Sequence, residues 1–260
     1  MKNIIVPLNA FNRNEVLEKG QEAFVEMIAL AGAYGIEIRR ELFLNHHQSL
    51  EELKTEIDKY QLFTVFSAPV EAWNSASELN KEDLLRTFNE AKRLGAPWVK
   101  VSLGHYHRDR SDLAELKELL SQHSHIQLFI ENDQTMYGGH VDSLKRFFES
   151  AHQLEVPVMM TFDSGNWYYT KQLVPHALEQ LAPYVGYLHL KHVEKHGQVL
   201  VTLPLPSEQD TEWRRIVKEF PRNVKKAIEF PIDPITKIAH YIEMVEEKER
   251  MEGGGILWNN

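Results

Sequence analysis

Short β-branched runs alternate with longer stretches of helical period along the chain, and this alternation restricts the fold more than any other feature. Runs that predict strands occupy residues 3–8, 35–40, 62–68, 98–104, 126–131, 157–163, 185–193 and 224–230. Stretches that predict helices occupy residues 16–34, 50–59, 81–94, 111–123, 141–154, 173–181, 208–218 and 234–249. Eight such units without a linker rich in Pro, Gly or Ser favour an α/β fold, a closed (β/α)8 TIM barrel, over an open doubly wound sheet.

The length agrees with this fold, because about 250 residues are typical of one such barrel. We therefore expect a single TIM-barrel domain over residues 1–260. The sequence after the first strand, PLNAFNRN, lacks the Gly-rich fingerprint of dinucleotide-binding proteins. The longest spacing between strands contains a Gly and the alternating run VLVTL, which predict a small hairpin within residues 192–210.

Charge and cysteine content exclude several classes of function. The chain has 29 Lys and Arg against 38 Asp and Glu, a net charge of −9, which disfavours binding to nucleic acid. It has no Cys, so disulfides, thiolate zinc sites and cysteine nucleophiles are excluded. The first residues lack the apolar core of a signal peptide, and no run approaches 18 apolar residues. We expect a soluble, cytoplasmic protein that binds no membrane.

Four polar residues close or interrupt successive apolar strands: Glu131, Asp163, His189 and Glu229. Functional residues of a barrel lie at the carboxyl ends of its strands, so these side chains are expected to meet there. Each alone could be a helix cap or a loop charge, but four in phase are hard to explain in that way. Three crowded carboxylates repel one another unless a divalent cation binds them. The donor set suits Mn²⁺, Mg²⁺ or Co²⁺, with Zn²⁺ as an alternative.

Several short motifs follow one another at barrel spacing: GIEIRRE, SAP, FIEN, TFDSGNW, YLHLKHV and AIEF. In this order they resemble the sugar phosphate isomerase/epimerase superfamily, with its xylose isomerase-like TIM barrel and its AP endonuclease branch. The resemblance implies that Glu131, Asp163, His189 and Glu229 bind the metal. It also implies that Glu131 and Glu229 act as acid and base. Lys191 matches a common Lys of the seventh strand, and Glu37 matches an acidic site residue.

Two departures from this resemblance concern the substrate. Asn166 stands where some epimerases of the superfamily have a His three residues after the metal-binding Asp. Their downstream Arg has no match, because His192, Lys195 and His196 occupy that loop. The substrate of those epimerases is therefore not transferred to this chain. The net charge also argues against the endonuclease branch.

The expected function is a metal-dependent isomerase or epimerase of carbohydrate metabolism, acting on a small sugar or sugar acid. Proton transfer next to a carbonyl would pass through an enediolate. Lys191 would stabilise the oxyanion or form a salt bridge with a neighbouring carboxylate. The alternatives are a metal-dependent dehydratase of a sugar acid or related hydroxy-carbonyl compound, and a non-catalytic sugar-binding barrel.

The remaining candidates are side chains that could contact a carbohydrate through an aromatic face or a polar group. They are Glu37, Trp73, His105, His107, Asn132, Asn166, Trp167 and Trp213. For Trp73 and Trp213, simple packing is an equal alternative. His46 and His47 could line the rim or belong to a solvated loop. The C-terminal GGGILWNN could dock on its own barrel or on a second copy, so a homodimer is a further option.

Overall fold

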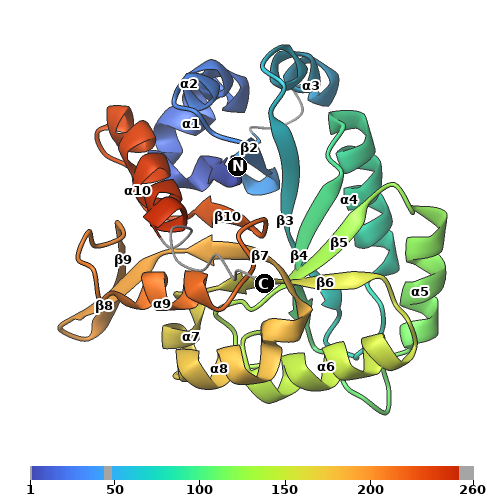
Figure 1. Ribbon diagram of the computed structural model, residues 1–260. Coiled ribbons are helices and arrows are strands. Elements are labelled where there is room, and N and C mark those ends of the chain that lie inside the picture. Colours follow the sequence, from blue (N-terminus) through green and yellow to red (C-terminus); the bar gives the residue numbers. More distant parts are fainter. Residues whose placement is uncertain (1, 44–48, 252–260) are drawn as a thin grey trace, which may run out of the picture.

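A closed barrel of parallel strands organises the part of the chain that the computed structural model describes, residues 2–43 and 49–251. Its strands run in the spatial order β1-β10-β7-β6-β5-β4-β3-β2, and Figure 1 labels all of them except β1. They are β1 (Ile4–Pro7), β2 (Gly35–Arg39), β3 (Phe63–Trp73), β4 (Trp98–Gly104), β5 (Gln127–Glu131), β6 (Val158–Asp163), β7 (Val185–Leu190) and β10 (Lys225–Ile228). The predicted barrel is confirmed. His46, His47 and the C-terminal GGGILWNN lie outside the described residues.

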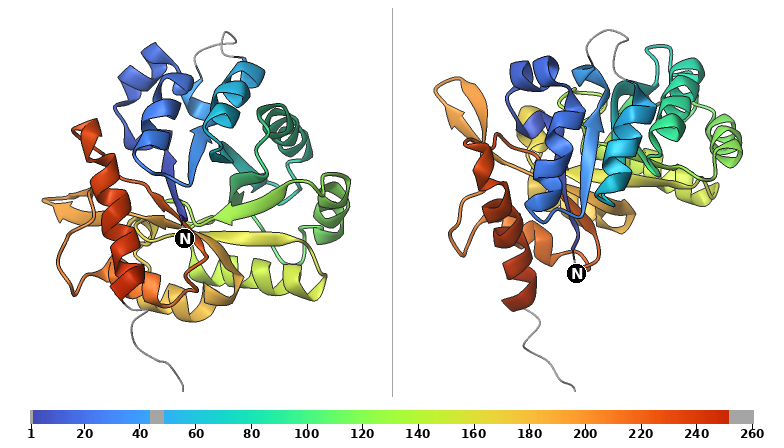
Figure 2. Two further views of the ribbon diagram at one scale, coloured as in Figure 1. Left: turned by 45° about the horizontal axis from the view of Figure 1, so that its top comes forward. Right: turned by 90° about the horizontal axis from the view of Figure 1, so that it is seen from above.

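Helices cover the outside of the barrel (Figure 2). They are α1 (Arg13–Lys19), α2 (Val25–Leu30), α3 (Leu50–Lys59), α4 (Lys81–Leu94), α5 (Leu113–Gln122), α6 (Val141–Gln153), α7 (Asn166–Tyr169), α8 (Val174–Leu181), α9 (Glu212–Lys218) and α10 (Ile238–Met251). Their buried apolar faces pack against the sheet in one large core. None of the helices in the described ranges is both long and apolar enough to cross a bilayer.

The helix predicted over residues 16–34 is interrupted. Gly20 ends α1 with a φ of 81°, and a 3-10 turn (Gln21–Phe24) precedes α2. This left-handed conformation is easy only for glycine. The interruption turns the buried Gln21 toward β2, where its amide donates to the Arg39 carbonyl and accepts from the Arg39 N–H, both at 2.9 Å. The break therefore fixes the end of β2.

Two strands end differently from their predictions. Strand β3 continues to Trp73, past the predicted end at residue 68, with a register shift between Ser67 and Glu71. Strand β7 ends at Leu190, and the chain then forms the antiparallel hairpin β8 (His192–His196) and β9 (Val199–Leu203). The predicted hairpin is confirmed, and it extends from the side of the barrel (Figure 1).

An apolar layer inside the barrel supports the polar residues at its carboxyl end. This layer contains Ile5, Val65, Phe129, Tyr187 and Ala227. Side chains of a strand return to the same face every two residues. Two residues beyond Phe129, Tyr187 and Ala227 lie Glu131, His189 and Glu229. The strand period therefore directs the three predicted metal ligands inward, on top of the apolar layer.

Candidate metal centre at the carboxyl ends of the strands

The structure brings the four predicted ligands together. Glu131 ends β5, Asp163 ends β6, His189 lies in β7, and Glu229 directly follows β10. One ligand atom from each residue lies within 4.8 Å of the other three. Asp163 and His189 are also register partners in neighbouring strands. Parallel pairing at one end of the barrel thus assembles a set of three carboxylates and one imidazole.

His189 is oriented as a metal ligand. Its Nε2 lies 2.9 Å from Glu37 Oε2, and this carboxylate also accepts a hydrogen bond from the Tyr187 hydroxyl at 2.9 Å. Its buried Nδ1 has no hydrogen bond of acceptable geometry, although Glu131 Oε1 and Glu229 Oε2 lie 3.1 and 3.0 Å away. Metal-binding histidines commonly donate their other N–H to a carboxylate in this way. The donor set and the orientation of Nδ1 fit a divalent cation.

Asp163 is held by the backbone that follows β6. Its Oδ1 accepts from the N–H groups of Gly165 and Asn166, both at 2.9 Å. Asn132 bonds both main-chain groups of Asp163: its Oδ1 accepts from the N–H at 2.8 Å, and its Nδ2 donates to the carbonyl at 3.0 Å. Asn166 donates to the Asn132 carbonyl at 2.8 Å and accepts from Gln134 at 3.1 Å. Asn132 and Asn166, predicted as substrate contacts, therefore use their amides to position Asp163.

Three cations surround the carboxylates, and only Lys191 was predicted from the sequence. Lys191 Nζ lies 2.7 Å from Asp163 Oδ2 and 2.9 Å from Glu229 Oε2. The buried Lys100 of β4 donates to both oxygens of Glu131 at 2.8 Å, and its Nζ lies 3.3 Å from Glu37 Oε1. Lys100 is the sole charge within the run WVKVSLG, which is the sequence feature that could have identified it.

The third cation, Arg39 at the end of β2, contacts both Glu37 and Glu229. Its Nη1 lies 2.9 Å from Glu37 Oε1 and 3.1 Å from Glu229 Oε1, and its Nε contacts Glu41 at 2.8 Å. Asn9 donates to the same Glu229 oxygen at 2.9 Å. Both Arg39 and Asn9 were missed by sequence reasoning, because each follows or ends a strand where a loop charge or a turn residue is ordinary.

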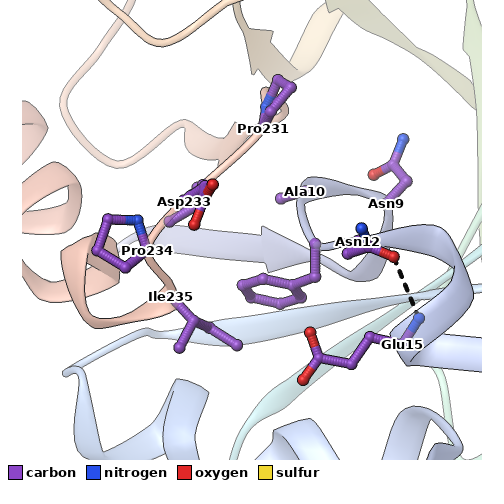
Figure 3. A pocket seen from close by; sticks show the side chains of 10 residues that line it. Asn9, Ala10, Asn12, Glu15, Pro231, Asp233, Pro234 and Ile235 are labelled. Atoms are coloured by element: carbon purple, nitrogen blue, oxygen red, sulfur yellow. Dashed lines mark hydrogen bonds between the residues drawn. The ribbon is translucent and has the colours of Figure 1, made fainter.

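Asn9 also lines a cavity of about 590 Å³ between the loops that follow β1 and β10 (Figure 3). Pro231, Pro234 and Ile235 form one side of the cavity, and Asn12 and Glu15 lie across from them. Phe11 also lines the cavity. Because Asn9 bonds Glu229, this cavity adjoins the candidate metal centre at the same end of the barrel.

The other predicted contact residues occupy two kinds of position. The indoles of Trp73, Trp167 and Trp213 are buried, and Trp213 Nε1 donates to the Pro206 carbonyl at 2.9 Å. These three side chains pack within the protein. His105 stacks on Tyr137 with ring centroids 3.7 Å apart, so these two rings lie together beyond β4 and β5. His107 lines a separate cavity of about 330 Å³ with Arg108 and Arg146.

Comparison with solved structures identifies the fold. A xylose isomerase domain-containing protein from Salmonella typhimurium superimposes with a TM-score of 0.70 and 13% identity, over 96% of this chain and 97% of that one. The chain has the xylose isomerase-like TIM-barrel fold. D-psicose 3-epimerase, solved in the presence of D-fructose, is similar with a TM-score of 0.67 and 13% identity, over 97% and 100% of the two chains.

A third similar structure is a probable 3-DHS dehydratase from Bacillus anthracis, with a TM-score of 0.63 and 13% identity, over 95% of this chain and 99% of that one. The sequence matches no protein-family model and no curated protein. The xylose isomerase-like barrel therefore includes proteins described as epimerases and as a dehydratase, and the chemistry of this chain must be inferred from its own residues.

The charged environment shifts two predicted ligands toward their protonated forms. Burial is the main cause that raises the pKa of Asp163 to about 7. Lys191 lowers this pKa, but repulsion from Glu229 and Glu131 raises it again. Burial and Lys100 lower the pKa of His189, but the carboxylates of Glu37, Glu229 and Glu131 outweigh them and raise it to about 9. The protonated forms of both groups thus increase the free energy of unfolding of the metal-free protein at low pH. This contribution is lost as pH rises through the two raised pKa values.

Metal binding should therefore release protons. A divalent cation must displace the His189 proton and any proton on Asp163, so we expect about one and a half protons released at pH 7 and about one near pH 8, where the apparent affinity should rise about tenfold per pH unit. Above pH 9 both effects should disappear. Calorimetric titration with Mn²⁺ in buffers of different ionisation enthalpy measures the released protons. Proton release that stays constant from pH 7 to 10 would contradict the assignment of His189 as a ligand.

Proposed function

We propose that residues 1–260 act as one barrel domain that catalyses divalent-metal-dependent isomerisation or epimerisation of a small sugar or sugar acid. The observation that carries this proposal is the position of Glu131 and Glu229, whose carboxylates both lie beside the unbonded Nδ1 of His189. Two carboxylates at one metal site are suited to remove and return a proton on a bound substrate. The fold similarity to an epimerase supports the same class.

Glu131, Asp163, His189 and Glu229 would hold the metal, with Mn²⁺, Mg²⁺ or Co²⁺ favoured by the oxygen-rich set and Zn²⁺ as the alternative. When bound, the metal supplies Lewis-acid polarisation of the substrate carbonyl and hydroxyl oxygens. One glutamate, as its carboxylate, removes the proton on the carbon next to the carbonyl. The other, as its carboxylic acid, delivers a proton to the enediolate, so the two glutamates exchange protonation states in the reaction. Lys191 lies beside Asp163 and Glu229, where its ammonium can stabilise the developing oxyanion.

Surrounding side chains keep the two glutamates in fixed and different environments. Lys100 binds both oxygens of Glu131, so that carboxylate is held from the β4 side. Asn9, Arg39 and Lys191 hold Glu229 through its two oxygens. Burial raises the pKa of the Glu229 carboxyl, but Lys191, His189 and Lys100 together lower it well below its usual range. Glu229 therefore stays ionised, the form that a carboxylate needs before it can accept a proton.

A dehydratase is the second candidate, supported by the fold similarity to a probable 3-DHS dehydratase. The same base would remove the proton, but a β-hydroxyl would then leave as water. A sugar-binding barrel without turnover is the remaining alternative, and the paired glutamates argue against it because binding alone does not need them.

The proposed function predicts exchange of the proton next to the carbonyl. Protein prepared with Mn²⁺ should incorporate deuterium from D₂O into a substrate among a panel of ketoses, aldoses and sugar acids, as followed by proton NMR. Chelator should stop the exchange, and elemental analysis should find one bound divalent cation per chain. Loss of water with an unsaturated product would assign the dehydratase instead. A protein that retains no metal and is insensitive to chelator would refute both enzymatic candidates.

A further inference from the structure

Lys191 differs from the other two cations in the partners it has. Among the described residues, its carboxylate contacts are Asp163 Oδ2 at 2.7 Å and Glu229 Oε2 at 2.9 Å. Both oxygens belong to residues of the cluster that can hold the metal. Lys100, in contrast, also contacts Glu37, and Arg39 contacts Glu37 and Glu41, which are outside that cluster. A metal bound to the cluster would therefore compete with Lys191 for every carboxylate that Lys191 contacts.

The backbone keeps Lys191 close to the metal ligands. A Cβ added at Gly165 would lie 2.5 Å from Lys191 Cγ and 2.9 Å from Lys191 Cδ, so the lysine stem packs directly against this glycine. The Lys191 side chain is only 9% exposed. Because the lysine stem is enclosed, the ammonium cannot move far into solvent when Asp163 and Glu229 bind a divalent cation. A bound divalent cation would add two positive charges beside this ammonium, and the same carboxylates would then have to neutralise both, so a further anion would be stabilised there.

We propose that this anion is the carboxylate of the substrate. Lys191 forms an ion pair with it when Asp163 and Glu229 bind the metal. Because the ammonium is held beside the metal ligands, the carboxylate must lie close to the reacting carbon. This geometry selects sugar acids that carry the carboxylate next to the carbonyl or hydroxyl carbon that binds the metal. A phosphate at the far end of a sugar would not reach Lys191. The proposal rests on the proposed function, whose substrate class it narrows.

The proposal predicts that metal and substrate anion strengthen each other's binding. D-Gluconate, which has a carboxylate beside a hydroxyl carbon, should raise the Mn²⁺ affinity of the protein by about 5- to 150-fold, the usual range of coupling between two sites. D-Glucitol, which has CH₂OH in place of the carboxylate, should have no effect. D-Glucitol 6-phosphate, which carries its charge on a phosphate and has no carboxylate beside a hydroxyl carbon, should also have no effect on the Mn²⁺ affinity. Calorimetric titration of Mn²⁺ at a fixed, saturating concentration of each compound measures the three affinities.

Variants separate Lys191 from the other effects of charge. K191M should bind Mn²⁺ more tightly than the natural protein when no carbohydrate is present, because the competing ammonium is gone, and gluconate should no longer change its affinity. K195M, which removes a lysine from the exposed hairpin, should behave like the natural protein. Thermal unfolding in chelator checks that K191M folds, and a lower melting temperature is expected because its carboxylates lose their cation.

Three results would overturn the proposal: equal effects of gluconate and glucitol on the natural protein, a larger effect of the phosphate, or K191M binding Mn²⁺ no more tightly than the natural protein. The first two comparisons need no variant, so they stand even if K191M does not fold. These failures leave the proposed function intact, since Mn²⁺ still binds. Absence of Mn²⁺ binding by both the natural protein and K191M would instead refute the proposed function itself.

Discussion

Replacing Glu229 or Glu131 by Gln should reduce deuterium exchange into an identified substrate by about 10²- to 10⁴-fold, the contribution typical of a positioned acid or base. Glutamine preserves the shape and one acceptor oxygen of each side chain but cannot accept the substrate proton. Lys100 would still contact position 131, and Asn9 and Lys191 would still surround position 229. We therefore expect both variants to fold like the natural protein, which circular dichroism checks.

Each glutamate is also a predicted metal ligand, so the metal content of each variant must be measured with its activity. Exchange lost while Mn²⁺ is retained identifies the acid or base, whereas exchange restored by excess Mn²⁺ identifies only a ligand. E194Q is the matched control, because Glu194 lies on the exposed hairpin between His192 and His196 and should not affect exchange. Full activity of both E131Q and E229Q would exclude the proposed proton transfer.

Replacing His189 by Ala should lower Mn²⁺ affinity by more than about 100-fold, because it removes a ligand outright. Replacing Glu37 by Gln should cost about 10- to 100-fold, the range for a residue that orients a metal-binding histidine. This order follows from the contacts: Nδ1 faces the carboxylate cluster, and Glu37 contacts only the opposite nitrogen. Calorimetric titration measures both affinities.

His189→Gln tests the same residue without leaving a large cavity beneath the centre, and it too should bind Mn²⁺ weakly. Trp73 is buried outside the cluster, so Trp73→Phe should lower stability but leave the metal affinity unchanged. If H189A, H189Q and the natural protein bound Mn²⁺ equally well, the metal would have to lie elsewhere in the protein.

The period of the strands was enough to predict the barrel and the clustering of the four predicted metal ligands. Glu131, His189 and Glu229 lie two residues beyond inward-facing apolar residues, so their direction follows from the alternation of the strand. The same rule could not find Lys100. A strand buried on both faces is apolar at nearly every position, so the sequence does not tell whether a lone charge within it points inward.

Other features depend on contacts between distant segments, which periodicity does not encode. The sequence places Asn132 and Asn166 near Glu131 and Asp163, but it does not reveal that the amide of Asn132 bonds the Asp163 backbone or that the amide of Asn166 bonds the Asn132 carbonyl. The break at Gly20 is set by the pairing of Gln21 with the end of β2. Trp73 was placed beyond its strand because the register shift in β3 extends the strand past a proline.

The paired bonds between Asn132 and the backbone of Asp163 affect how the barrel can diversify. They join the ends of β5 and β6 through one side chain, so the separation of Glu131 and Asp163, two predicted ligands from different strands, depends on this amide and on the Gly165 and Asn166 backbone that follows β6. Loop residues outside these contacts can then lengthen, shorten or change sequence without altering the distance between the two carboxylates. In the metal-dependent enzyme that we propose, substrate preference is thereby uncoupled from the geometry of the metal ligands, and new specificities can arise while the four ligands stay in place.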